Sequence, residues 1–200
     1  MYLIKSLNLF CGSSSGNNSA HIEAAKELGK ILAQNNISLI FGGASVGLMD
    51  ITANAVLQNG GKAIGIFPDF FPIGEIAHQN LTEMIFVKSM AERKYKMAEL
   101  SDAFLALPGG YGTLDELFEM MTFSQLDLHR KPVAILNSDG FYDGMLSQLH
   151  RMEKDGLMKP AHRQMLLTAN TVQGVMDALW AYVPPVQSPW MQKVNHAKSE

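Results

Sequence analysis

The stretch 105–116, LALPGGYGTLDE, has the residue types and spacing of an anion-binding turn. A buried strand is predicted to stop at Pro108, and a helical pattern begins at Thr113. A strand, a glycine turn and a helix start together present free backbone N–H groups and the positive end of the helix dipole. Glycine lets a phosphate approach the backbone closely because it has no Cβ. The sequence therefore predicts a bound phosphate on the turn formed by Gly109, Gly110, Tyr111, Gly112 and Thr113.

Glu116 lies about one helical turn beyond this loop and would face whatever group carries the phosphate. A second interpretation stays open. Thr113 and Glu116 have the spacing of a capping box, in which the two side chains only satisfy free N–H groups of the helix start. The spacing alone does not decide between the two roles.

Arg93 is the second residue with a chemical signal. The pattern predicts a helix over residues 89–100, begun by a capping box at Ser89 and Glu92. Arg93 shares one face of this helix with three apolar residues, Met90, Met97 and Leu100. A buried guanidinium needs an anionic partner, which is either a protein carboxylate or a ligand phosphate or carboxylate. Lys94 points about 100° away and is predicted to be a charge at the rim.

Two further glycine turns follow predicted strands, at 12–16 and at 42–47. The second resembles a dinucleotide-binding fingerprint only loosely, and close packing of the backbone explains it equally well. A nicotinamide site would place an acidic residue at the end of the second strand, where Phe41, Gly42 and Gly43 stand instead. No redox cofactor is therefore predicted.

Composition excludes several classes of protein. The 200 residues are 47% apolar and 18% charged, with a net charge of −3 and no basic block, which argues against nucleic-acid binding. Cys11 is the single cysteine and the six histidines are scattered, so neither an internal disulfide nor a metal site is predicted. No apolar run has the roughly 18 residues of a membrane span, and no charged leader precedes the first apolar stretch. We expect a cytoplasmic protein with no membrane partner.

Short apolar strands alternate with longer helical patterns along the chain, which predicts an α/β fold: a Rossmann-like, doubly wound parallel sheet with helices on both faces. The longest irregular segment is predicted at 68–82. A single nucleotide-binding domain is expected over 1–183, followed by a flexible tail over 184–200. The predicted strands are 3–11, 37–41, 63–67, 84–87, 103–107, 132–136 and 165–168, and the predicted helices are 19–34, 47–58, 89–100, one from residue 113, 142–154 and 172–182.

Two motifs together make the chain recognisable: Met90-x-x-Arg93-Lys94, and Pro108-Gly109-Gly110-x-Gly112-Thr113-x-x-Glu116. They resemble the signature of the LOG ("Lonely guy") family, cytokinin-activating phosphoribohydrolases that split a nucleoside 5′-monophosphate into free base and ribose 5-phosphate. The resemblance implies that Arg93 and Glu116 are catalytic, that no cofactor is needed and that the substrate is a small nucleotide. It implies substrate contacts from Glu75, Met90, Lys94, Ser13, Gly43 and the turn 109–113. Asp50 departs from the family pattern, where glycine is expected after Gly-Leu-Met.

Two alternative functions stand beside this resemblance. The same fold serves non-catalytic nucleotide or molybdenum-cofactor carriers, in which Arg93 and Glu116 would only shape a pocket. Such chains have also been labelled lysine decarboxylases, but nothing in this sequence sets up the lysine and ring-nitrogen partner of a pyridoxal enzyme.

The helix from Thr113 carries more apolar residues than one buried face requires, namely Phe118, Met120, Met121 and Phe123. Core packing explains them equally well, but the resemblance favours a homodimer.

Overall fold

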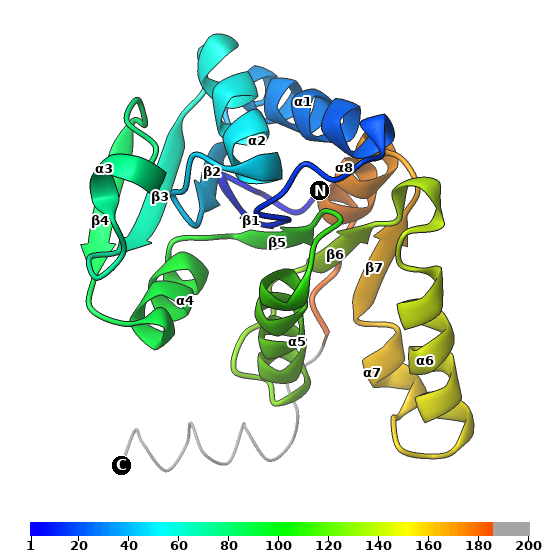
Figure 1. Ribbon diagram of the computed structural model, residues 1–200. Helices are drawn as coiled ribbons and strands as arrows, with labels where there is room; N and C mark the ends of the chain where they lie inside the picture. Colours follow the sequence, from blue (N-terminus) through cyan, green and yellow to red (C-terminus); the bar gives the residue numbers. More distant parts are fainter. Residues whose placement is uncertain (186–200) are drawn as a thin grey trace.

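Seven strands form one parallel sheet in the computed structural model, which describes residues 1–185 (Figure 1). Their order across the sheet is β4-β3-β2-β1-β5-β6-β7, and every neighbouring pair is parallel. This confirms the predicted doubly wound α/β fold. The strands are β1 (Ser6–Phe10), β2 (Ser38–Phe41), β3 (Ala63–Pro68), β4 (Glu83–Val87), β5 (Ala103–Ala106), β6 (Val133–Leu136) and β7 (Leu166–Ala169).

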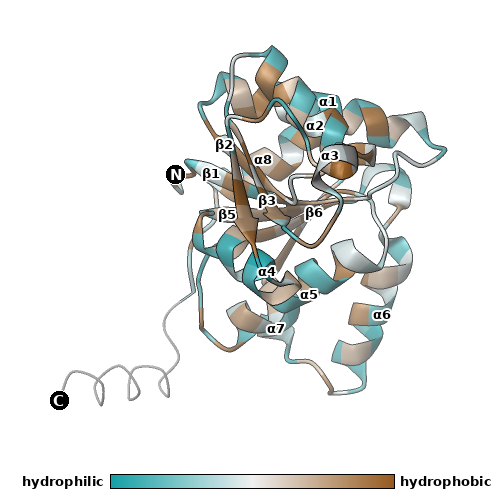
Figure 2. Cartoon of the chain, turned by 60° about the vertical axis from the view of Figure 1, so that its left-hand side comes forward, coloured by the Kyte–Doolittle hydropathy of each residue, from teal (hydrophilic) through white to brown (hydrophobic). Residues whose placement is uncertain are grey.

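Helices cover both faces of the sheet, with α1, α2 and α8 on one side and α4, α5 and α6 on the other (Figure 1). Apolar residues gather on the central strands, and polar residues lie on the outer sides of the helices (Figure 2). The helices are α1 (Ser19–Gln34), α2 (Gly47–Gln58), α3 (Ile73–Ile76), α4 (Met90–Glu99), α5 (Tyr111–Gln125), α6 (Asp143–Lys154), α7 (Pro160–Arg163) and α8 (Val172–Trp180), with a 3-10 turn η1 (Ser138–Gly140).

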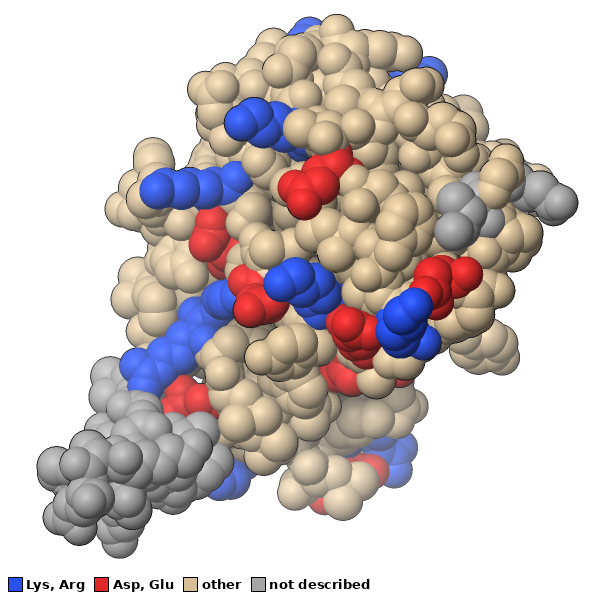
Figure 3. Space-filling model, turned by 90° about the vertical axis from the view of Figure 1, so that its left-hand side faces the viewer, with Lys and Arg blue, Asp and Glu red and all other residues tan. Residues whose placement is uncertain are grey.

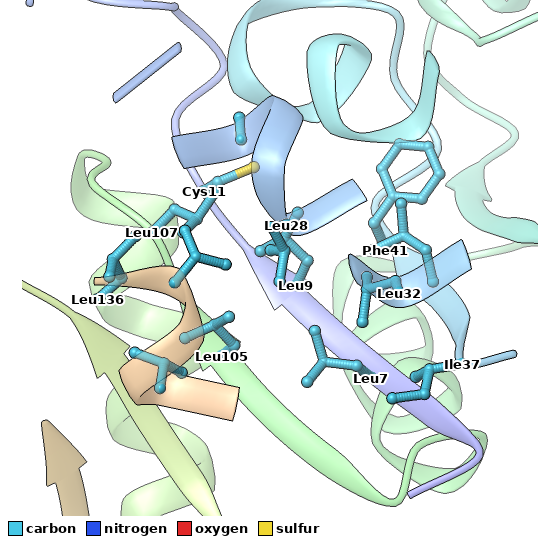
Figure 4. Packing of buried hydrophobic residues seen from close by; sticks show 14 of the residues in the cluster. Leu7, Leu9, Cys11, Leu28, Leu32, Ile37, Phe41, Leu105, Leu107 and Leu136 are labelled. Atoms are coloured by element: carbon cyan, nitrogen blue, oxygen red, sulfur yellow. The ribbon is translucent and has the colours of Figure 1, made fainter. Parts of the chain in front are cut away.

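Alternation along β1 explains how one strand serves both cores. Leu7 and Leu9 enter the cluster beneath α1, α2 and α8, where they pack with Leu28 and Leu32 of α1 (Figure 4). Phe10 points to the opposite face and packs in the cluster beneath α4, α5 and α6. Successive side chains of a strand point to opposite faces, so a strand covered on both sides is mainly apolar, and buried Asn8 is the exception in β1.

The chain order reverses at β1, which lies between β2 and β5. In a parallel sheet all strands end at the same edge, and the loops that leave β1 and β5 diverge there to opposite faces. Such a switch point is where open α/β sheets bind ligands. The three predicted glycine turns all lie at this edge, because they follow β1, β2 and β5.

Two parts of the chain differ from the prediction. The segment 68–82, predicted to be irregular, contains helix α3, and a bridge pairs Ala77 with Ala44. Helix α7 was not predicted, since four residues are too short for a periodic signal. Residues 186–200, which make up most of the predicted tail, lie outside the described residues.

Candidate active site

Helix α5 begins at Tyr111, two residues earlier than the pattern indicated, and Gly110 is its extended N-cap residue with φ −97° and ψ −150°. Among the described residues, no side chain caps this helix start. The capping-box interpretation of Thr113 and Glu116 is therefore wrong, because both residues lie inside the helix. The first-turn N–H groups remain available for an anion, as predicted for the glycine turn.

The loops that leave β1 and β5 are locked together beside this helix start. The Gly12 N–H donates a hydrogen bond to the Pro108 carbonyl oxygen over 3.0 Å. A Cβ on Gly109 would lie 2.1 Å from Thr113 Oγ1 and 2.8 Å from the Gly12 nitrogen. Gly109 is therefore required by close packing of the two loops, which fixes the position of the turn.

Arg93 and Glu116 meet across the gap between α4 and α5. Arg93 Nη1 lies 3.0 Å from Glu116 Oε1, and the two side chains are only 13% and 12% exposed. Arg93 Nε also donates to the Ile66 carbonyl oxygen at the end of β3, over 3.2 Å. The guanidinium from α4 is thus held by α5 and by β3. The anion that a buried Arg93 was predicted to need is Glu116, the carboxylate that was itself predicted to be functional.

Gly42, at the end of β2, makes room for this guanidinium. A Cβ on Gly42 would lie 1.7 Å from Arg93 Nη2 and 2.9 Å from Arg93 Cζ. The backbone of β2 is therefore the wall against which Arg93 rests. Gly42 was not predicted to be a site residue. The glycine pair after a predicted strand indicated that another group packs closely against the backbone, but it could not indicate that this group is the Arg93 guanidinium.

Burial raises the pKa of the Glu116 carboxyl from 4.5 to about 7. Arg93 opposes this rise in pKa, Asp115 adds to it, and Lys94 again opposes it. Burial also raises the pKa of the neighbouring Cys11 thiol, which stays protonated. Glu116 can therefore exchange a proton near neutral pH, whereas Cys11 is not a thiolate nucleophile.

A cavity of about 430 Å³ opens at this site. The start of α5, Arg93, Glu116 and Ser13 contribute polar groups to its lining, and β3 and the segments that follow β2, β3 and β4 contribute apolar side chains. The predicted site residues that line it are Ser13, Met90, Arg93, Gly110, Tyr111, Gly112, Thr113 and Glu116. Met90 lines the cavity but is 42% exposed, so it does not share the buried stripe predicted for it.

Three other predicted residues lie outside this cavity lining. Lys94, predicted to be a charge at the rim, is 19% exposed and paired: its side chain spans the gap to α5, where it lies 3.0 Å from Asp115 and 3.1 Å from Glu119. Gly43 has φ +74°, and a Cβ there would meet Gly65 of β3 at 3.2 Å, so its role is backbone packing. Gly109 packs against the β1 loop, as described above.

Glu75 lies in α3, and its side chain is outside the described part of the structure. Asp50, the departure from the expected pattern, lies in the first turn of α2 and does not line the cavity. Its carboxylate accepts a hydrogen bond from Asn54 Nδ2 over 2.9 Å. Asp50 is therefore not itself part of the described cavity lining.

Comparison with known proteins agrees with this geometry. A family model described as "Possible lysine decarboxylase" matches residues 49–179. The probable cytokinin riboside 5′-monophosphate phosphoribohydrolase LOGL3 of Oryza sativa subsp. japonica is 43% identical over 176 residues, which cover 88% of this chain and 83% of the relative. The phosphoribohydrolase LOG1 of Arabidopsis thaliana is 42% identical over 180 residues, covering 90% and 84% of the two chains.

The chain belongs to the LOG family. The likeness to these two LOG relatives covers 88% and 90% of this chain. Among solved structures, the molybdenum cofactor binding protein of Rippkaea orientalis superposes with a TM-score of 0.68 at 20% identity, covering 90% of this chain and 97% of that one. The Moco carrier protein of Chlamydomonas reinhardtii gives 0.65 at 20% identity, covering 87% and 94%. At this identity the likeness shows the fold alone.

Two further observations bear on partners of this LOG family member. Within residues 1–185, no helix is long and apolar enough to cross a membrane, and no cluster of three or more metal-ligating side chains is present. On the face drawn in Figure 3, basic and acidic side chains are interspersed. This face offers no basic surface for a nucleic acid.

Proposed function

We propose that the protein hydrolyses the N-glycosidic bond of nucleoside 5′-monophosphates, such as a cytokinin riboside 5′-monophosphate or AMP, to the free base and ribose 5-phosphate. One observation carries this proposal: a buried arginine–glutamate pair shares a cavity with an uncapped helix start. The phosphoribohydrolase names of the curated relatives support it.

The 5′-phosphate binds at the start of α5, where the N–H groups of the first turn and the helix dipole favour an anion. Glu116 lies inside the same helix, about one turn from its start. A ribose attached to the phosphate therefore extends toward the Arg93–Glu116 pair. Binding energy from the phosphate, which does not react, positions the sugar for the reaction.

Glu116 acts on the anomeric carbon. As the C1′–N bond breaks, positive charge builds up on the ribose, and the carboxylate stabilises it. Water forms the new C1′–O bond and gives its proton to Glu116, and the proton then leaves with the departing base. Arg93 holds the carboxylate in place through the 3.0 Å hydrogen bond and keeps its pKa from rising further.

The apolar part of the cavity lining receives the base. It is lined by apolar side chains, among them Val46, Met49, Phe67, Phe71 and Ile76. Such a surface binds an aromatic base by packing. Because apolar walls discriminate only weakly between related groups, it should tolerate differences between bases. We expect bases with apolar substituents to be accepted along with adenine.

A product assay tests the function. Incubation with AMP should release adenine and ribose 5-phosphate, and a panel of nucleoside monophosphates then ranks the bases. Glu116→Gln should lower turnover by at least about 10²-fold while the fold and AMP binding persist, because a general base is typically worth ~10²–10⁴-fold. Recovery of intact AMP from the wild-type protein would instead support the carrier alternative.

The lysine decarboxylase description receives no support from the site. No lysine is among the described residues that line the cavity, and Lys94 is held by Asp115 and Glu119. A pyridoxal enzyme needs a lysine that reaches its cofactor.

We also propose a cytoplasmic homodimer, with α5 at the interface. Tyr111 and Phe118 of α5 are 94% and 38% exposed, which leaves apolar surface beside the cavity for a second copy. Light scattering should give twice the 22.0 kDa of one chain, and Phe118→Glu should reduce this mass toward that of one chain. Cell fractionation tests the location.

A further inference from the structure

One side of the cavity is formed by the 69–80 segment, residues 69–80 between β3 and β4. Phe71 and Ile76 of this segment line the cavity. Its backbone is tied to the loop that follows β2: the Ser45 N–H donates to the Ile76 carbonyl over 2.7 Å, and the His78 N–H donates to the Gly43 carbonyl over 2.9 Å. These two bonds hold residues 76–78 against the loop but do not connect the segment to a helix.

A chain of side-chain hydrogen bonds links the same segment to helix α2. His78 is buried at 6% exposure, and its Nδ1 accepts the Asn80 N–H over 3.2 Å. The ring proton must then be on Nε2, which lies 3.3 Å from Asn54 Oδ1. Asn54 Nδ2 in turn donates to Asp50 Oδ2 over 2.9 Å.

The donors and acceptors of this chain determine one another. An ionised carboxylate only accepts, so Asp50 fixes the Asn54 amide with its NH₂ toward α2 and its oxygen toward His78. The Asn80 N–H fixes the tautomer of His78 from the other side. Asp50 Oδ1 also lies 3.7 Å from His78 Nε2, close enough to favour the proton on that nitrogen. Asp50, at the position where glycine was expected, thus orients the Asn54 amide.

We propose that His78 is a positioning residue, which fastens the 69–80 segment to α2 through Asn54 and Asp50 and so holds the apolar wall against the substrate. Only the expected change in KM rests on the proposed function; the anchoring of the segment does not. His78 does not line the cavity, so it acts through Phe71 and Ile76 and not by contact with the nucleotide.

Three variants test the anchor. His78→Leu removes the Nε2 donor, and Asn54→Leu removes its acceptor. His78→Gln is the matched control, because the glutamine Nε2 can still donate to Asn54 Oδ1. A hydrogen bond of ordinary strength corresponds to roughly a 2- to 12-fold change in an equilibrium. We therefore expect KM for AMP to rise by about that factor in both leucine variants, with kcat within about twofold of wild type and His78→Gln close to wild type.

Hydrogen exchange supplies a readout that does not depend on activity. Amide exchange should accelerate within 69–80 in both leucine variants and stay unchanged in the strands of the sheet. If His78→Leu fails to fold, Asn54→Leu carries the test. An unchanged KM in Asn54→Leu would overturn the proposal, as would equal effects of His78→Gln and His78→Leu or faster exchange throughout the sheet. If the wild type hydrolyses no nucleotide, the function fails, and exchange together with AMP affinity still decides the anchor.

Discussion

Replacing Gly42 by alanine tests whether Arg93 acts from its observed position. Gly42 has no positive φ, so alanine is compatible with its backbone, and the three atoms nearest to the added Cβ all belong to the Arg93 guanidinium. The new Cβ would lie 1.7 Å from Arg93 Nη2, whereas ordinary contacts begin at 3.4 Å, so the guanidinium must move by about 1.7 Å. Its bonds of 3.0 Å to Glu116 and 3.2 Å to Ile66 cannot both survive such a shift.

A displacement of about 1 Å in a catalytic group can cost ~10²-fold in rate, so we expect Gly42→Ala to lower kcat/KM for AMP by about 10²-fold or more. The pH profile supplies a second readout. Because Arg93 lowers the pKa of Glu116, moving it away should shift the acidic limb of the profile above its wild-type position near pH 7.

Gly144→Ala is the matched control. An added Cβ there meets no atom within 4 Å, and Gly144 lies in α6, away from the cavity. It should leave turnover unchanged and stabilise the helix by about 0.5–1 kcal/mol. Steady-state kinetics and thermal unfolding of both variants complete the experiment. A folded Gly42→Ala protein with turnover within threefold of wild type would refute the role given to Arg93.

Further predictions concern the pKa of Glu116 and the core. The rate of AMP hydrolysis should rise with pH through about 7 as Glu116 ionises, and Asp115→Asn should move this limb to lower pH, because the Asp115 charge raises the pKa of Glu116. Since folding raises that pKa from 4.5 to about 7, the contribution of Glu116 to stability is fully present below pH 4.5 and is lost as the pH rises through 7; Glu116→Gln should therefore gain in relative Tm between pH 5 and 8. Neither polar atom of the buried Asn8 side chain has a partner among the described residues, so Asn8→Leu should raise Tm by about 2–4 °C, and a lower Tm would show that the amide is satisfied. Tyr142 donates a buried hydrogen bond to the Leu107 carbonyl over 2.7 Å, and Tyr142→Phe should cost about 1 kcal/mol in chemical denaturation.

Local patterns were sufficient where a single element carries the signal. The apolar runs and glycine turns predicted the parallel sheet, and the cap predicted at Ser89 is confirmed by the 3.1 Å bond from the Glu92 N–H to Ser89 Oγ. The Glu92 carboxylate accepts the N–H of Lys88, one residue before the position that a capping box predicts. The same pattern at Thr113 failed, since Gly110 takes the N-cap position. The same spacing therefore marks a helix start at Ser89 but lies inside the helix at Thr113. At Thr113 the preceding glycine turn already begins the helix, and the glutamate is paired with Arg93.

The sequence by itself determined the fold class, the glycine turn at the start of α5 and the requirement that Arg93 meet an anion, because periodicity, glycine spacing and the cost of a buried charge are properties of short segments. Only the tertiary structure decided that this anion is Glu116, that Gly42 backs the guanidinium, that Lys94 is held by Asp115 and Glu119, and that His78 reaches α2. Each of these contacts joins segments that follow different strands, and their distance in space depends on the order of strands in the sheet, which no local pattern contains.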